Sequence, residues 1–189
     1  GMGTSGTAPE ARRRVWATLL PSALHADASA RGACVSVLHA IRHAFYKRVG
    51  YVATSPTVRA RISPRALPPR SSTGLVTRAA KKGDRKTIEH LYSNSLSTNT
   101  GWIARSRSYW DELFTNERLH FSVVQNEDRP VGYTAWSPSQ PEPHARTTLR
   151  VRECIGDTAS VQRAIFSMFS GLRDQVDVVE IDLPIDSPW

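Results

Sequence analysis

A run rich in proline and serine divides the sequence about one third of the way along. Residues 63–74 contain three prolines and three serines. Because proline fixes φ and lacks a backbone N–H, such a run does not suit the interior of a helix or a central strand. We therefore predict a connector at residues 65–75, between a first domain at 1–64 and a second at 76–189. A chain of 189 residues has room for two small or incomplete domains.

The spacing of apolar residues predicts helices and strands on both sides of this connector. Before it we expect a helix, a strand, a second helix and an extended stretch, at residues 16–30, 33–38, 40–49 and 51–62. After it we expect two helices, three strands, a long helix and a last strand, the strands at residues 119–124, 131–136, 147–155 and 176–183. The predicted fold class is α/β (α+β), a mixed sheet with flanking helices.

Local signals predict where several helices begin and end. Gly32 and Gly50 are expected to end helices, because glycine tolerates a positive φ. Asp84, Ser106 and either Asp157 or Thr158 are expected to begin them as N-caps. The second-domain helices should bury the following apolar residues: Ile88, Leu91, Tyr92 and Leu96; Tyr109, Trp110, Leu113 and Phe114; and Val161, Ala164, Ile165, Met168, Phe169 and Leu172.

Positive charge is concentrated in the first part of the chain. The net charge is +8, and residues 1–75 carry 11 basic and two acidic residues, so the rest of the chain is close to neutral. This asymmetry indicates an anionic partner, such as a phosphorylated cofactor, a membrane surface or a nucleic acid, unless it is only a solvated surface. A nucleic acid is the least favoured, because few aromatic residues accompany the basic ones.

Several other classes find no support in the sequence. No apolar run reaches the roughly 18 residues of a membrane span. The start of the chain lacks the apolar stretch of a signal peptide. Cys34 and Cys154 lie far apart and have no metal or redox spacing. We therefore expect a cytoplasmic protein without membrane contact and without a bound metal.

Three consecutive arginines precede the first predicted helix. Basic side chains at a helix start oppose the helix dipole, and an anion bound among the free N–H groups would remove the conflict. We therefore predict a diphosphate site that uses the side chains of Arg12, Arg13 and Arg14 and the backbone of Val15, Trp16 and Ala17. The alternative is a capping box at residues 7–10, with the arginines in solvent.

A tyrosine near the end of the second predicted helix is the candidate acid. Tyr46 is followed by Lys47 and Arg48. Its phenol could donate a proton to a leaving thiolate. The alternative is a half-buried tyrosine that packs beneath the helix with its hydroxyl in water.

Taken in this order, these segments resemble the GNAT family of acetyl-CoA-dependent N-acetyltransferases. Residues Pro9–Arg14, leading into a helix, are similar to the family's pyrophosphate-binding loop. Val35–Leu38 and Phe45–Tyr51 are similar to its fifth strand and the helix that follows.

The second half resembles one branch of that family in particular. Ser108–Trp110, Val131–Tyr133, Leu149–Glu153 and the helix after Asp157 are similar to the central domain of Eis (enhanced intracellular survival) proteins. In that branch two GNAT-type domains precede a sterol-carrier-like domain. The resemblance implies the later part of one GNAT domain followed by the earlier part of a second, so we expect a chain truncated at both ends.

The resemblance also implies an activity and its site. Acetyl-CoA would be the cosubstrate, with its pyrophosphate held by Arg12, Arg13 and Arg14 and by the N–H groups of residues 15–17. Tyr46 would be the general acid, and the acceptor would be the primary amine of a small molecule or a lysine. The alternative is a catalytically inactive GNAT-fold remnant that acts as an interaction or oligomerisation module. Val15, which replaces the family's loop glycine, favours that alternative. A second copy of the chain, or its second half, is expected to cover the first domain's open strand edge.

Overall fold

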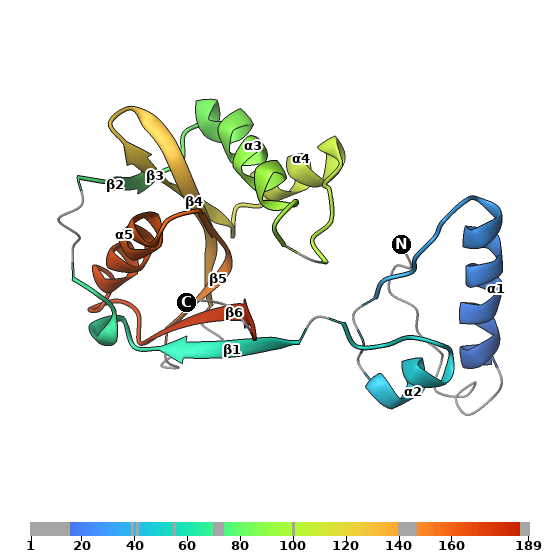
Figure 1. Ribbon diagram of the computed structural model, residues 1–189. Helices are drawn as coiled ribbons and strands as arrows, with labels where there is room; N and C mark the ends of the chain where they lie inside the picture. Colours follow the sequence, from blue (N-terminus) through green and yellow to red (C-terminus); the bar gives the residue numbers. More distant parts are fainter. Residues whose placement is uncertain are drawn as a thin grey trace. The chain divides into compact units, whose positions relative to one another are not determined.

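The structure is a computed structural model, and its described residues fall into two compact units. It describes residues 16–38, 40, 42–54, 56–69, 74–99, 101–139 and 147–185, with the backbone alone at 16–18. The first unit comprises residues 1–54 and the second residues 55–189 (Figure 1).

The division after Thr54 corrects the predicted domain boundary. Thr57–Ile62, which we had placed in the first domain, form strand β1 in the sheet of the second unit. The predicted connector is part of that unit as well, because Pro64–Ala66 form a 3₁₀ turn and the Leu67 side chain is buried in the core. Proline suits the first position of such a turn, where its missing N–H would have no partner.

In the first unit, helix α1 spans Trp16–Ala30 and ends as predicted. Gly32 has a φ of +83°. Its N–H donates to the carbonyl of Ser29 at 2.9 Å, and the next N–H, of Ala33, donates to the carbonyl of Ala28 at 2.9 Å. This pair of bonds is a Schellman motif, which satisfies the last carbonyls of the helix.

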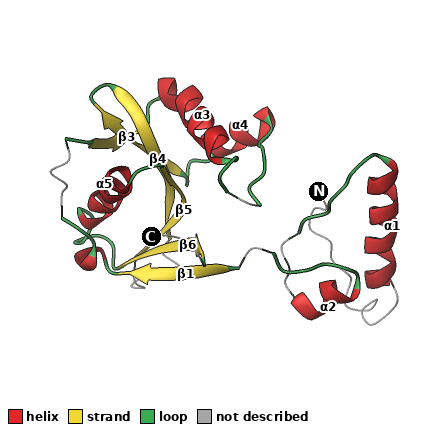
Figure 2. Cartoon of the chain, viewed as in Figure 1, coloured by secondary structure: helices red, strands yellow, loops and turns green. Residues whose placement is uncertain are grey.

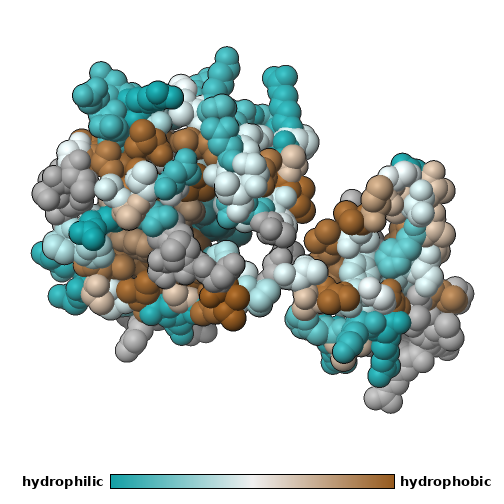
Figure 3. All heavy atoms as spheres, in the orientation of Figure 1, coloured by the Kyte–Doolittle hydropathy of each residue, from teal (hydrophilic) through white to brown (hydrophobic). Residues whose placement is uncertain are grey.

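The strand predicted at residues 33–38 is not formed. These residues are extended but unpaired, and the side chains of Val35 and Val37 are 80% and 65% exposed. The described part of the first unit contains no strand with which they could pair. Figure 3 shows apolar residues on the surface of this unit. The intrinsic β-propensity of these residues is not enough to form a strand, because most of the stability of a strand comes from side-chain contacts with the strand paired to it.

Six strands form the sheet of the second unit, in the order β1-β6-β5-β4-β3-β2 (Figures 1 and 2). All neighbours are antiparallel except β5 and β6, which are parallel and are joined through helix α5. Besides β1, the strands are β2 (Val76–Ala79), β3 (His120–Asn126), β4 (Arg129–Ser139), β5 (Thr148–Gly156) and β6 (Val178–Pro184). The helices are α3 (Arg85–Ser95), α4 (Arg107–Thr115) and α5 (Ala159–Ser170).

Helices lie on both faces of this sheet (Figure 1), and each face has its own apolar core. Helix α5 covers one face, where Val161, Ala164, Ile165 and Phe169 of the predicted stripe are buried and Met168 and Leu172 pack beside them. Helices α3 and α4 pack over the other face around Ile88, Tyr92, Trp110, Val123, Tyr133 and Ile155.

Two helix starts in this unit agree with the sequence, and one predicted core residue does not. The side chains of Ser106 and Thr158 accept the N–H groups of Tyr109 and Val161 and cap α4 and α5. Tyr109, however, is 46% exposed, because it points away from the core that holds Trp110. Two aromatic neighbours on a helix lie about 100° apart and cannot both face the sheet.

A close approach of α5 to the sheet depends on two glycines. A Cβ added at Gly132 of β4 would lie 2.4 Å from Cγ1 of Val161 and 2.7 Å from the carbonyl oxygen of Ile155. A Cβ at Gly156 of β5 would lie 2.4 Å from the same Val161 atom. The first turn of α5 therefore packs directly on the backbones of two neighbouring strands.

We expect Gly132→Ala to lower the free energy of unfolding of the second unit by about 2 kcal/mol, because the added methyl overpacks a rigid contact. Gly83→Ala is the matched control, since nothing lies within 4 Å of a Cβ at that position. Denaturant titration of both variants tests this, and equal midpoints would show that α5 moves freely away from the sheet.

Candidate functional site

The predicted anion site falls only partly within the described residues. Arg12, Arg13, Arg14 and Val15 lie outside them, so their role stays a prediction. Trp16 and Ala17 open helix α1, whose first turn contains no acidic residue. The partial positive charge of that helix start is therefore not compensated by a carboxylate of its own first turn, and an anion would fit there.

Tyr46 lies in helix α2, which is shorter than predicted. It spans His43–Arg48 and begins only after Arg42, whose backbone is extended. Gly50 has a φ of +92°, as a helix-ending glycine should. The N–H of Tyr51 then donates to the carbonyl of Tyr46 at 3.1 Å, so the Gly50 turn fixes the two tyrosines to each other.

Tyr46 lines a basic hollow at the surface of the first unit. The hollow has a volume of about 400 Å³ and is lined by Arg42, Ala44, Phe45, Tyr46 and Arg48. The Tyr46 ring is half-buried, and its hydroxyl has no hydrogen-bond partner among the described residues. Two arginines and a tyrosine hydroxyl that is unpartnered within the described residues could together receive an anionic group and supply a proton to it.

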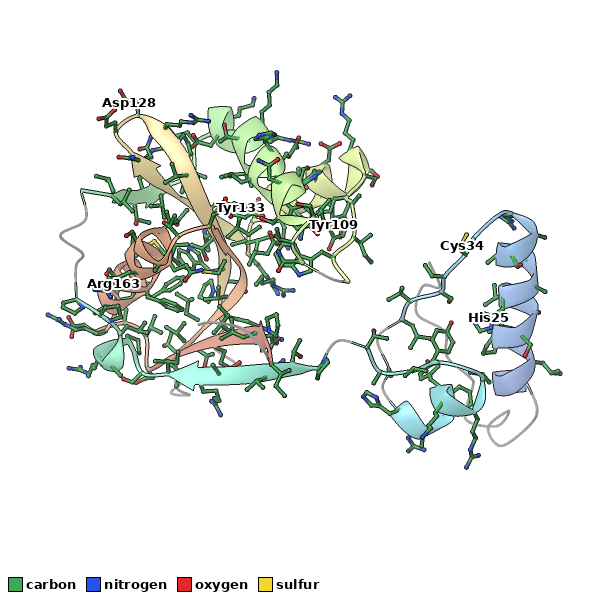
Figure 4. All side chains as sticks on the ribbon, in the orientation of Figure 1. His25, Cys34, Tyr109, Asp128, Tyr133 and Arg163 are labelled. Carbon is green, nitrogen blue, oxygen red and sulfur yellow. The ribbon has the colours of Figure 1, made fainter. Side chains whose placement is uncertain are left out.

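A second tyrosine, which the sequence analysis did not select, lies against this site. The rings of Tyr46 and Tyr51 meet edge to face, with their centres 5.9 Å apart. The Tyr51 hydroxyl lies 2.7 Å from Nε2 of His25 and 2.6 Å from Oγ of Ser36. Figure 4 shows His25 projecting from α1 toward the rest of this unit.

This Ser36–Tyr51–His25 network can relay a proton, since each member both donates and accepts hydrogen bonds when the imidazole is neutral. The signal that could have revealed Tyr51 is its position directly after Gly50. In a Schellman motif the residue after the glycine bonds back to the last helical turn, which here contains Tyr46.

The corresponding helix start of the second unit is not built for a diphosphate. The turn from β5 into α5 carries Asp157 and contains no basic residue between Gly156 and Val161. Thr158 already accepts the N–H of Val161, and the Gln162 amide donates to the carbonyl of Gly156 at 3.2 Å. The negative charge of Asp157 beside this helix start disfavours a diphosphate, and the Thr158 side chain already accepts one of the helix N–H groups.

A largely buried arginine of the second unit is held among aromatic rings. The Arg105 guanidinium lies 3.8 Å from the ring centre of Tyr92 and 4.6 Å from that of Trp110. It also forms an ion pair with Glu153, which accepts the hydroxyl of Tyr133 at 2.6 Å. Figure 4 shows Tyr133 on the sheet in the same region as Tyr109 of α4.

The surroundings of this cluster keep Arg105 charged and Tyr133 neutral. Burial opposes the charge of Arg105, but its hydrogen bond and ion pair with Glu153 outweigh burial and raise the arginine pKa. Burial, together with the Glu153 charge, raises the pKa of Tyr133 well above its usual value. Tyr133 is therefore a donor to Glu153 at neutral pH, and the cluster is suited to holding α4 on the sheet rather than to proton transfer.

Other reactive groups in the described residues are few. Burial raises the pKa of Cys154, so its thiol stays protonated and unreactive. No group of three or more histidine, cysteine or acidic residues in the described ranges could hold a metal ion. Within the same ranges, no helix is long and apolar enough to cross a membrane.

We expect Arg105→Met to destabilise the second unit by about 3 kcal/mol, because it leaves the largely buried Glu153 carboxylate unpaired. Adding Glu153→Gln should recover part of that loss. Arg65→Met is the control, since Arg65 pairs with Asp174 in solvent. Denaturant titration gives the comparison, and an equal effect of the two single variants would contradict the role of Arg105.

Comparisons with known proteins identify the class to which this geometry corresponds. Family models of an "Acetyltransferase (GNAT) domain" match residues 101–189 and residues 1–54. No curated protein matches the chain. The six-stranded mixed sheet with helices on both faces is the GNAT fold, and two segments of the chain match models of that domain.

Solved structures with this fold include three whose likeness covers 97% of the chain. They are GCN5-related N-acetyltransferases from Anabaena variabilis (TM-score 0.83, 19% identity) and Kribbella flavida (0.76, 19%), and Eis1 from Mycobacterium abscessus (0.68, 26%). The match spans 47%, 45% and 48% of those chains, so the present chain is about half their length.

Proposed function

We propose that this chain carries the cofactor-binding part of an Eis-like N-acetyltransferase, which moves an acetyl group from acetyl-CoA to a primary amine. GNAT enzymes use acetyl-CoA, and a GNAT model matches the first unit. The observation that carries the proposal is the basic hollow beside Tyr46, whose phenol has no partner among the described residues. The likeness to an Eis structure supports the choice of branch.

Some of the chain's residues would bind the diphosphate, and another would supply the proton. Arg12, Arg13 and Arg14, with the N–H groups at the start of α1, would bind the diphosphate as an anion at a helix N-terminus. The Tyr46 hydroxyl would hold the proton that the departing thiolate receives. When bound, acetyl-CoA supplies the activated acetyl thioester.

Tyr51 would act through Tyr46 in this arrangement. The hydrogen bonds of Tyr51 to His25 and Ser36 fix its ring, and that ring packs edge to face against Tyr46. Such a contact limits the positions available to the Tyr46 phenol, and a general acid needs its hydroxyl within hydrogen-bond reach of the leaving group.

We expect CoA to stabilise the chain by about 2.7 kcal/mol when its concentration is 100 times the dissociation constant. The Arg12→Gln, Arg13→Gln, Arg14→Gln triple variant should lose this effect, which thermal denaturation with and without CoA can measure. The matched control removes the same charge from the second unit, at Arg129, Arg163 and Arg173, all of which are exposed. If the unsubstituted chain shows no shift at millimolar CoA, the acetyltransferase proposal fails and the inactive remnant is the better description.

We expect Tyr46→Phe to lower kcat by about 100-fold or more with CoA affinity unchanged, because only the proton is removed. Tyr51→Phe should have a smaller effect on kcat and should destabilise the first unit, since it breaks two hydrogen bonds. Steady-state rates with a small primary amine, alongside CoA titrations, distinguish the two. A severe loss in Tyr51→Phe with a nearly normal Tyr46→Phe would make Tyr51 the acid.

A further inference from the structure

A second basic hollow lies in the second unit. It has a volume of about 300 Å³ and lies on the sheet between β4, β5 and the turn that follows α4. Eight residues line it: Asn116, Arg118, Leu119, Ser137, Pro138, Ser139, Arg150 and Arg152. Three arginines, two serines and an asparagine thus line a space sized for one small ligand.

Two of these arginines lie two residues apart on the same face of β5, and a β-bulge follows the first of them. Ala135 of β4 pairs with Glu153 and Trp136 pairs with Val151, so Arg152 has no partner in the ladder. Arg150 and Arg152 both line the hollow, while Val151 between them is buried against α5. Bulges of this kind re-aim side chains and are frequent beside binding sites.

The positive charge in the hollow is only partly neutralised. Arg150 donates to Asp182 at 3.1 Å, but Asp182 also accepts from Arg59 at 2.7 Å, so one carboxylate serves two guanidiniums. Arg118 and Arg152 have no ion-pair partner among the described residues. Glu117 is the neighbour of Arg118 in sequence but does not line the hollow. Like charges this close repel each other, and a bound anion would relieve the repulsion.

The hydrogen-bond donors of the lining residues indicate which kind of anion the hollow would bind. Guanidiniums bind tetrahedral phosphate oxygens through paired N–H groups, and hydroxyl and amide donors can satisfy the oxygens that remain. Among the lining residues the ionised groups are all cations, so the hollow offers nothing that would bind a cation. We propose that this hollow is a binding site for a small phosphomonoester, independent of the acetyltransferase site proposed for the first unit.

The test is calorimetric titration of the full chain with phenyl phosphate at pH 8, where it is a dianion, at constant ionic strength. Phthalate, a ring dianion with two carboxylates, is the ligand control. We expect phenyl phosphate to bind, phthalate to bind at least about tenfold more weakly, and each of Arg118→Gln and Arg152→Gln to weaken phosphate binding by about tenfold.

The control variant is Arg163→Gln, which removes one charge from the exposed side of α5 (Figure 4) and should leave the affinity unchanged. Circular dichroism spectra and unfolding midpoints show that each variant is folded. Three results would overturn the proposal: no binding at millimolar phenyl phosphate, equal affinity for phthalate, or the same loss in Arg163→Gln as in Arg152→Gln. None of these results bears on the CoA experiment, which concerns the other unit.

Discussion

The bulge at Arg152 is the constraint on which the second unit depends. A regular strand would alternate its side chains and send Arg152 and Glu153 to opposite faces of the sheet. The extra residue instead keeps both on the face covered by α3 and α4, and returns Cys154 to the α5 side. Glu153 can then meet Arg105 and Tyr133, while Arg152 turns into the hollow beside Arg150. The inserted residue therefore brings Glu153 to the side of the sheet where Arg105 and Tyr133 lie, next to Arg152 in the lining of the hollow.

The parts of this fold that follow from nearby residues could be predicted from the sequence. The apolar stripe of α5 and its cap at Thr158 are local, as are the glycine turns after α1 and α2, and the structure confirms them. The strand predicted at residues 33–38 and the boundary predicted at 65–75 are wrong for a common reason. A strand exists only where another strand pairs with it, and the partner of β1 is β6, more than a hundred residues later. No local pattern contains that information.

The candidate site was predictable to a similar extent. Tyr46 stood out because it lies in a helical turn beside basic residues, and the structure places it in a basic hollow. Tyr51 did not, because its importance comes from His25 and Ser36, which lie on other segments. Side-chain networks that join distant segments require tertiary structure before they can be recognised, whereas a helix cap or a capping glycine requires only its neighbours.

The two units differ in charge where a helix begins. The start of α1 follows three arginines in the sequence and has no acid in its first turn, whereas the start of α5 follows Asp157 and is capped by Thr158. A helix N-terminus attracts an anion in either case. In the second unit Asp157 adds a negative charge just before the helix, whereas the sequence just before α1 is basic. This difference favours the first unit for the acetyl donor proposed above.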